Sequence, residues 1–315
     1  MGAAMLLWNV FSQVLLPILG MTGCGWVLDR VFRLDLGTLV KLNIYLLVPA
    51  FLFHEVVTSS LGAGVALRVM GFTGCILGSM FLLSAWVARG EGEARGQRRS
   101  LQLATMFYNS GNYGVPLMAL AFPGTGPVLQ VFVLLTQNIC TFTVGLLLAS
   151  GGENTGWRRV LPMLRQVSLW AVVLALWVRW QGIPVREWRW FWVPVEYIHQ
   201  ALVGMALVTL GAQLSQTQVR QSARRLSWAL GLRLVGGPVI AAALCGVFGF
   251  RGEEAAVMIV SAAFPTAVNT ALLAHEFQAD SEFAAAVVFY STLASMFTVT
   301  CLIAVLRMPQ VVAAF

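Results

Sequence analysis

Long apolar runs, separated by short polar and charged stretches, set the pattern of this chain of 315 residues. Each run has roughly 20 or more mostly apolar residues, the length that an α-helix needs to cross a bilayer. Ten such runs are present, at residues 5–28, 38–57, 63–88, 100–121, 126–149, 161–180, 194–215, 226–249, 253–277 and 282–306. The runs are continuously apolar rather than alternating, which favours helices over a transmembrane barrel. The pattern predicts an all-α integral membrane protein with ten transmembrane helices.

The composition agrees with this prediction. Hydrophobic residues make up 58% of the chain and charged residues 10%, whereas a soluble domain carries roughly a quarter charged residues. The net charge of +7 does not indicate nucleic acid, because the arginines stand in short tracts without an aromatic-interleaved basic face. The five cysteines lie inside apolar runs and show no zinc-like spacing. We expect no cofactor, no metal and no nucleic-acid partner.

The arginines predict an orientation in the membrane. The loops after every odd-numbered run carry the larger set: Arg30, Arg33, Arg89, Arg95, Arg98, Arg99, Arg158, Arg159, Arg220, Arg224 and Arg225. The opposite side carries the smaller set: Arg68, Arg179, Arg186, Arg189, Arg251 and Arg307. Since cytoplasmic loops are enriched in Arg and Lys, we expect a multi-pass protein of the cytoplasmic (inner) membrane with both termini outside the cytoplasm. Residues 1–28 lack a basic n-region and are predicted to be a retained first span.

Ten runs suggest two halves of five. Five is an odd number, so the second half would be inserted upside down relative to the first. We therefore expect a first repeat at residues 1–149, a short cytoplasmic linker at 150–160 and an inverted repeat at 161–315. A short echo between Leu67–Gly71 in the third run and Leu232–Gly236 in the eighth gives this weak support.

Two runs contain residues that do not suit an ordinary lipid-facing helix. The fourth includes the octapeptide Asn109–Pro116 (NSGNYGVP), and the ninth includes the segment Ser261–Thr270 (SAAFPTAVNT). Glycine and proline weaken a helix, so we expect a break across each segment. Broken helices at matching positions of two halves are the best sequence pointer to a transporter site. Their half-helix N-termini would suit an anion; the alternative is a pair of proline kinks filled by neighbouring side chains.

The candidate substrate-binding residues follow from these breaks and from polar residues in the fifth run. They are Asn109, Ser110, Asn112, Tyr113, Pro116, Gln137, Asn138, Pro265, Thr266, Asn269 and Thr270. For the residues of the fifth run, helix packing through small polar groups is the alternative.

Several charged residues lie inside or at the ends of the runs. Arg68 and Arg233 either reach back to the nearest interface or attract an anion. The pair His54–Glu55 and the pair Glu196/His199 are read as solvated helix ends, with a proton relay as the alternative. The aromatic segment Glu187–Trp192 is read as an interfacial anchor, with a substrate cage as the alternative.

The two broken segments carry a resemblance. Asn109–Pro116 and Ala263–Asn269 (AFPTAVN), with Ala274–Phe277 (AHEF) downstream, resemble the motifs of the auxin efflux carrier family. That family includes bacterial malonate and malate carriers and the plant PIN-FORMED auxin exporters, and the resemblance covers essentially the whole chain.

The resemblance implies that spans four and nine cross at their breaks. It further implies a scaffold of spans one, two, six and seven, a transport domain of spans three to five and eight to ten, elevator-like movement and a homodimer formed through the scaffold. Asn109 falls on the asparagine that meets the substrate carboxylate in the family. The chain departs from the plant pattern near Asn269–Thr270, where the second crossover proline is replaced, and in span three, which has no acidic residue.

These observations predict a secondary transporter or facilitative carrier of a small organic anion, a carboxylate, and not an enzyme. A sodium-coupled organic anion symporter of the bile-acid type is the alternative. An intramembrane enzyme is disfavoured because the sequence has no His-Glu-x-x-His motif and no Gly-x-Ser-x-Gly elbow. Direct ATP hydrolysis is disfavoured because there is no phosphate-binding loop.

Overall fold

The computed structural model describes residues 3–59, 62–151, 166–216 and 222–308, and this part of the chain is almost entirely helical. The expected linker at 150–160 lies almost wholly outside the described residues. The helices of the first half, with the π-helical turns (η) inside them, are α1 (Ala3–Val10), η1 (Phe11–Leu15), α2 (Leu16–Phe32), α3 (Leu36–Leu42), η2 (Asn43–Leu47), α4 (Val48–Thr58), α5 (Ala63–Gly90), α6 (Arg95–Met106), η3 (Ser110–Gly114), α7 (Val115–Ala121), α8 (Gly126–Cys140), η4 (Thr141–Gly145) and α9 (Leu146–Ala149). Those of the second half are α11 (Val167–Trp180), α12 (Arg189–Gln216), α13 (Ala223–Gly231), η6 (Leu232–Gly236), α14 (Gly237–Phe248), α15 (Gly252–Ala262), α16 (Val268–Glu276) and α17 (Ser281–Leu306).

Seven described helices are long and apolar enough to cross a membrane, and each lies on one of the predicted runs. They are Trp8–Phe32, Leu36–Thr58, Gly64–Gly90, Gly126–Ala149, Arg189–Gln216, Ala223–Phe248 and Ser281–Leu306. The shorter apolar helix α11 lies on the sixth run, whose first residues are outside the described ranges. The fourth and ninth runs are each divided into shorter helices, α6 and α7 in one and α15 and α16 in the other. The all-helical membrane fold is confirmed, while the ten-span inverted repeat stays a prediction.

Four prolines inside the spans follow π-helical turns, whereas Pro194 lies within α12 without one. Pro17, Pro49, Pro116 and Pro238 each stand at the second residue after a turn, following η1, η2, η3 and η6 respectively. A proline has no N–H and its ring collides with the carbonyl one turn earlier, and a wider π turn relieves that collision without ending the helix.

This arrangement corrects the expected position of the first break. The sequence predicted a break across Asn109–Pro116, but the helix resumes at Ser110 and continues through Pro116 to Ala121. The interruption lies just upstream, at Phe107–Asn109, where the backbone is extended or irregular. Pro116 is therefore a residue of the continuing helix and not the cause of the break.

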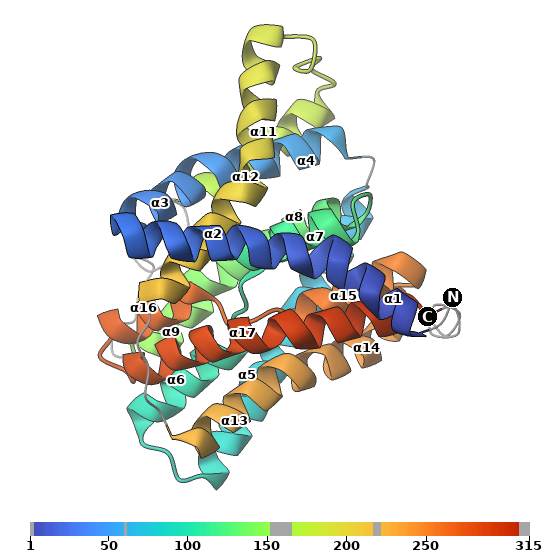
Figure 1. Ribbon diagram of the computed structural model, residues 1–315. Coiled ribbons are helices and arrows are strands. Elements are labelled where there is room, and N and C mark those ends of the chain that lie inside the picture. Colours follow the sequence, from blue (N-terminus) through green and yellow to red (C-terminus); the bar gives the residue numbers. More distant parts are fainter. Residues whose placement is uncertain (1–2, 60–61, 152–165, 217–221, 309–315) are drawn as a thin grey trace.

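The helices pack in two groups (Figure 1). In one group α2 runs along α12, and α4 packs against both α11 and α12. In the other, α5 packs against α6, α8 and α14, while α17 packs against α6 and α16. At one end of the second group Arg225 forms ion pairs with Glu93 at 2.8 Å and Asp280 at 2.7 Å. These ion pairs join the loop before α6, the start of α13 and the loop before α17.

The first group is held by a close crossing of two glycines. A Cβ atom on Gly25 of α2 would collide with the backbone carbonyl of Val208, and one on Gly211 of α12 would collide with the backbone of Thr22 and Trp26. Small residues that let two backbones touch are the usual means of packing helices in lipid, where apolar side chains gain little from leaving the solvent.

Gly25→Ala is therefore expected to separate α2 from α12 and to destabilise the protein by about 1–3 kcal/mol, the usual cost of overpacking. The matched control is Gly23→Ala on the same helix, because a Cβ atom there meets nothing within 4 Å. The melting temperature of both variants in detergent gives the measurement. Equal melting temperatures would show that the crossing is not tight.

Candidate functional site

The two breaks pair with each other. The backbone N–H of Asn109 donates to the carbonyl of Pro265 at 2.7 Å, and the N–H of Ala267 donates to the carbonyl of Phe107 at 3.0 Å. Tyr108 and Thr266 thus form an isolated antiparallel bridge. Each interrupted segment supplies hydrogen-bond partners that the other lost when its helix ended, and unpaired backbone groups would otherwise be costly in lipid.

Side chains tie the breaks to neighbouring helices. The hydroxyl of Thr266 donates to the carbonyl of Ala104 in α6 at 2.7 Å. The amide of Gln130, in α8, donates to the carbonyl of Ser110 at 2.8 Å and accepts from the hydroxyl of Ser261 at 3.1 Å. Gln130 therefore bridges the start of η3 and the end of α15.

A single buried arginine contacts the ends of both helices that lead into the breaks. Arg233 is fully buried, and its Nη1 donates to the carbonyl of Thr105 at 2.6 Å. Its Nη2 donates to the carbonyl of Ala262, and its guanidinium lies 4.8 Å from the ring centre of Tyr108. Thr105 is in the last turn of α6 and Ala262 is the last residue of α15.

The guanidinium is well suited to this position. The last carbonyls of a helix have no partner within the helix and carry the negative end of its dipole. The planar fork of an arginine presents donors in several directions and stays charged. Arg233 thus stabilises two helix C-termini together and lies outside the lining of the cavity described next.

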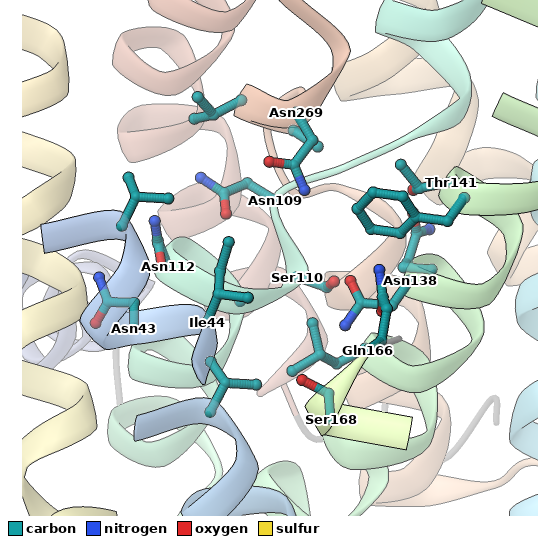
Figure 2. Close-up of a pocket in the computed structure, with 18 of the residues that line it drawn as sticks. Asn43, Ile44, Asn109, Ser110, Asn112, Asn138, Thr141, Gln166, Ser168 and Asn269 are labelled. Carbon is teal, nitrogen blue, oxygen red and sulfur yellow. The ribbon is translucent and has the colours of Figure 1, made fainter. Parts of the chain in front are cut away.

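The opposite side of the breaks borders a cavity of about 400 Å³. Eight carboxamide side chains line it: Asn43, Asn109, Asn112, Gln137, Asn138, Gln166, Gln213 and Asn269. Among the described residues, no acidic, basic, histidine or cysteine side chain lines it. Figure 2 shows amides converging on this space from the breaks and from the helices on either side.

The first residues of both helices after the breaks line this cavity. They come from the start of η3, at Ser110 and Gly111, and from the start of α16, at Val268 and Asn269. Helix N-termini present free N–H groups and a positive dipole end. The positive ends of two half-helices therefore face the cavity, while the negative ends of the other two face Arg233.

Asn109 occupies the junction between break and cavity. The residue is 7% exposed, and its Nδ2 is buried without a hydrogen-bond partner among the described residues. Figure 2 shows its amide beside that of Asn269, at the edge of the cavity formed by the breaks. A buried amide donor without a partner is costly, unless a bound molecule completes it.

The structure brings six of the predicted site residues together around the cavity: Asn109, Ser110, Asn112, Gln137, Asn138 and Asn269. The side chains of other candidates take part in packing or internal hydrogen bonds. Tyr113 packs against Phe264 with ring centres 5.6 Å apart, and Thr270 donates to the carbonyl of Ala267 at 2.7 Å. Pro265 and Thr266 form the pairing between the breaks, and Pro116 lies in the helix beyond.

The two intramembrane arginines do not share one environment. Arg68 lies near the start of α5, 3.5 Å from the carbonyl of Gly249 and 5.3 Å from the ring centre of Phe250. It is partly exposed, whereas Arg233 is enclosed. Neither lines the cavity.

Sequence reasoning missed several polar residues of this region. Asn43, Gln166 and Gln213 line the cavity from the first helix group, and Gln130 holds the breaks. Asn43, Gln130 and Gln213 each stand between two apolar residues within a run, and Gln166 follows Arg165 near the start of one. The signal available in the sequence was an amide at membrane depth, which needs a hydrogen-bond partner.

Comparisons with known proteins indicate a membrane transporter. The family model described as "Membrane transport protein" matches residues 160–303. An "Uncharacterized transporter" of Methanothermobacter thermautotrophicus is 28% identical over 90% of this chain and 95% of its own. A "Putative malonate transporter" of Rhizobium meliloti is 25% identical over 94% of this chain and 96% of its own. These matches confirm the resemblance predicted from the motifs.

Proposed function

We propose that this membrane transporter carries a small organic anion, a carboxylate, in the cavity beside the paired breaks. The single observation behind the proposal is the opposition of charges across the breaks. Two helix C-termini meet a buried arginine on one side, and two helix N-termini face an uncharged cavity rich in amides on the other.

An anion suits this cavity better than a cation. A helix N-terminus favours a negative charge by about 0.3–1 kcal/mol, and more in partly buried settings. No carboxylate among the lining residues would repel an anion or attract a cation. Amides donate hydrogen bonds without a charge of their own, so they bind a carboxylate weakly enough for a carrier to release it. The relative described as a malonate transporter gives this class of substrate further support.

We further propose alternating access by movement of one helix group against the other. The cavity lies between them: η2 and α11–α12 line it from the first group, and α8, η4 and the breaks from the second. Lining residues Val40, Gln166 and Gln213 stand near the helix ends that join the arginine-rich loops. With those loops in the cytoplasm, this cavity corresponds to an inward-facing arrangement, and a homodimer through the first group remains our expectation.

Uptake by proteoliposomes tests the proposal. We expect saturable uptake of radiolabelled malonate that excess mono- or dicarboxylate reduces and the neutral isostere malonamide does not. Protein-free liposomes give the background. If the protein transported or bound cations or neutral sugars but no carboxylate, the proposal would be wrong.

The same assay separates the carrier from the sodium-coupled alternative. Uptake with an inward sodium gradient is compared with uptake in which choline replaces sodium. An unchanged rate supports a carrier that does not use sodium, whereas uptake that needs the gradient would favour the symporter.

A further inference from the structure

Two histidines and a glutamate from two helices meet outside the cavity. His54 and Glu55 lie in the last turns of α4, and His199 lies on α12, 144 positions further along the chain than Glu55. The Oε1 of Glu55 is 2.9 Å from Nε2 of His199 and 3.4 Å from Nδ1 of His54. One ligand atom from each residue lies within 4.8 Å of the other two. The sequence suggested solvated helix ends, but the fold gathers them into one cluster.

Four aromatic rings stack in a column around the cluster. The imidazoles of His54 and His199 stack with centres 3.9 Å apart and planes 23° apart. Trp192 stacks on His54 at 5.1 Å, and Phe51 stacks on His199 at 5.5 Å. The side chains of His54, Glu55 and His199 are 12–21% exposed, while the Nδ1 of His54 is buried. The rings therefore hold the cluster in place close to the protein surface.

The hydrogen bonds within the cluster do not satisfy all of its polar atoms. One carboxylate oxygen faces two imidazoles, and the Nδ1 of His54 has no hydrogen-bond partner among the described residues. Two protonated imidazoles at stacking distance would repel each other, since like charges this close are costly. Each neutral imidazole has one in-plane lone pair that can bind a cation, and the two stacked rings would turn relative to each other to share one ion.

Two nearby carboxylates, of Glu55 and Glu196, favour a cation, whereas the guanidinium of Arg179 opposes one. Glu55 lies in the last turn of α4, which contains no basic residue, and a carboxylate at a helix C-terminus is unfavourable. Arg179 of α11 donates to the backbone carbonyl of Val56 at 3.2 Å. Glu196 stands one turn before His199 on α12 and adds a second carboxylate to the same region.

We propose that His54, Glu55 and His199 bind a divalent transition-metal ion, with zinc as the best match. Two imidazole nitrogens and one carboxylate are a common zinc ligand set, with water at the fourth position. Imidazole ligands suit zinc better than they suit calcium or magnesium. Ligand atoms around tetrahedral zinc are roughly 3.3 Å apart, as follows from bond lengths near 2 Å. The two contacts to Glu55, at 2.9 Å and 3.4 Å, need little adjustment.

The bound ion would join α4 to α12 within the first helix group. The site lies toward the opposite ends of these helices from cavity residues Asn43 and Gln213. Its role is therefore to fix the packing of the two helices, and the transported solute does not touch it. This inference does not depend on the proposed substrate.

Metal binding is tested on the full chain, purified through a tag without histidines and stripped with EDTA. We expect about one equivalent of zinc per chain by mass spectrometry after equilibration with micromolar zinc and buffer exchange. The melting temperature should rise by about 5 °C over the EDTA-treated protein, as expected for an ion at about a hundred times its dissociation constant. Wild-type protein that retains no zinc and shows no shift would overturn the proposal.

Matched variants locate the ion. His199→Gln and Glu55→Gln should each lose at least tenfold in zinc affinity, while His275→Gln should bind as the wild type does, because His275 is the third histidine of the chain and lies on α16. Equal binding by all variants would show adventitious zinc and overturn the site. If one of the two cluster variants fails to fold, the other variant and the zinc-dependent melting shift of the wild type still show whether the site binds zinc.

Discussion

Arg233→Met is expected to abolish transport and to lower the melting temperature by many degrees. The fully buried guanidinium supplies donors to carbonyls at the ends of α6 and α15. Methionine fills similar space but leaves these carbonyls unpaired, and each buried unpaired group costs about 1–3 kcal/mol. The pairing of the breaks would then lose the contact that holds both ends. Melting temperature and malonate uptake on the same preparation give the measurement.

Two further variants show whether the effect of Arg233→Met comes from lost hydrogen bonds or from lost charge. Arg233→Lys should give partial stability and little transport, because an ammonium is a point charge that cannot match the spread of the guanidinium fork. Arg68→Met is the control for loss of an intramembrane arginine. It should change stability little, because the contacts of Arg68 among the described residues are a long one of 3.5 Å to a carbonyl and one to the ring of Phe250. If Arg233→Met kept its stability and lost only substrate affinity, Arg233 would act on the anion, as the sequence had allowed.

The helical segments were predictable because lipid imposes a simple length rule. The run expected at 126–149 is reproduced by α8, η4 and α9, which end at the same residues. Other boundaries differ by a few residues where polar ends continue the helix, as at Arg189 before the run expected from 194. Hydrophobicity determines where a chain can cross a bilayer, and helices are the simplest way to satisfy its backbone.

The position of the first break was not predictable from helix propensity. Glycine and proline pointed to Asn109–Pro116, yet the interruption lies at Phe107–Asn109, in residues that disfavour a helix much less than glycine or proline does. Pro265 does lie in its break. The difference arises from tertiary contacts, because the bridge to Thr266 and the contacts of Arg233 determine where the backbone is freed.

The sequence predicted only those site residues that lie within the two local motifs or among the polar residues of the fifth run. Asn109 and Asn269 stood within the motifs, whereas Asn43 and Gln213 reach the cavity only through packing of distant helices. The role of Arg233 could not be assigned either, because its partners are distant in the sequence. Ala262 lies 29 residues after it and Thr105 lies 128 residues before it. Such contacts leave no periodic signal in the sequence.

Asn109→Ala is expected to weaken carboxylate binding five- to about a hundredfold, which corresponds to about 1–3 kcal/mol for an unpaired buried partner. The unpartnered Nδ2 of Asn109 is the donor that the bound carboxylate would accept from, beside the N-terminal end of η3. Stability should change little, because no described protein group loses a hydrogen bond to this Nδ2. Asn9→Ala, in α1 away from the cavity, is the control for removal of an amide from a span.

The isosteric variant Asn109→Asp separates binding from packing. Ionised aspartate keeps the size of the side chain but has no N–H donor, and it adds a negative charge next to the bound anion. If Asn109 binds the substrate, this variant should lose more affinity than Asn109→Ala. If Asn109 only fills space, the aspartate should bind substrate almost normally and the alanine should melt early with intact affinity. Thermal melting and malonate affinity of the same purified variants distinguish these outcomes. A donor held at the junction of two broken helices would then be required for the anion and dispensable for the fold.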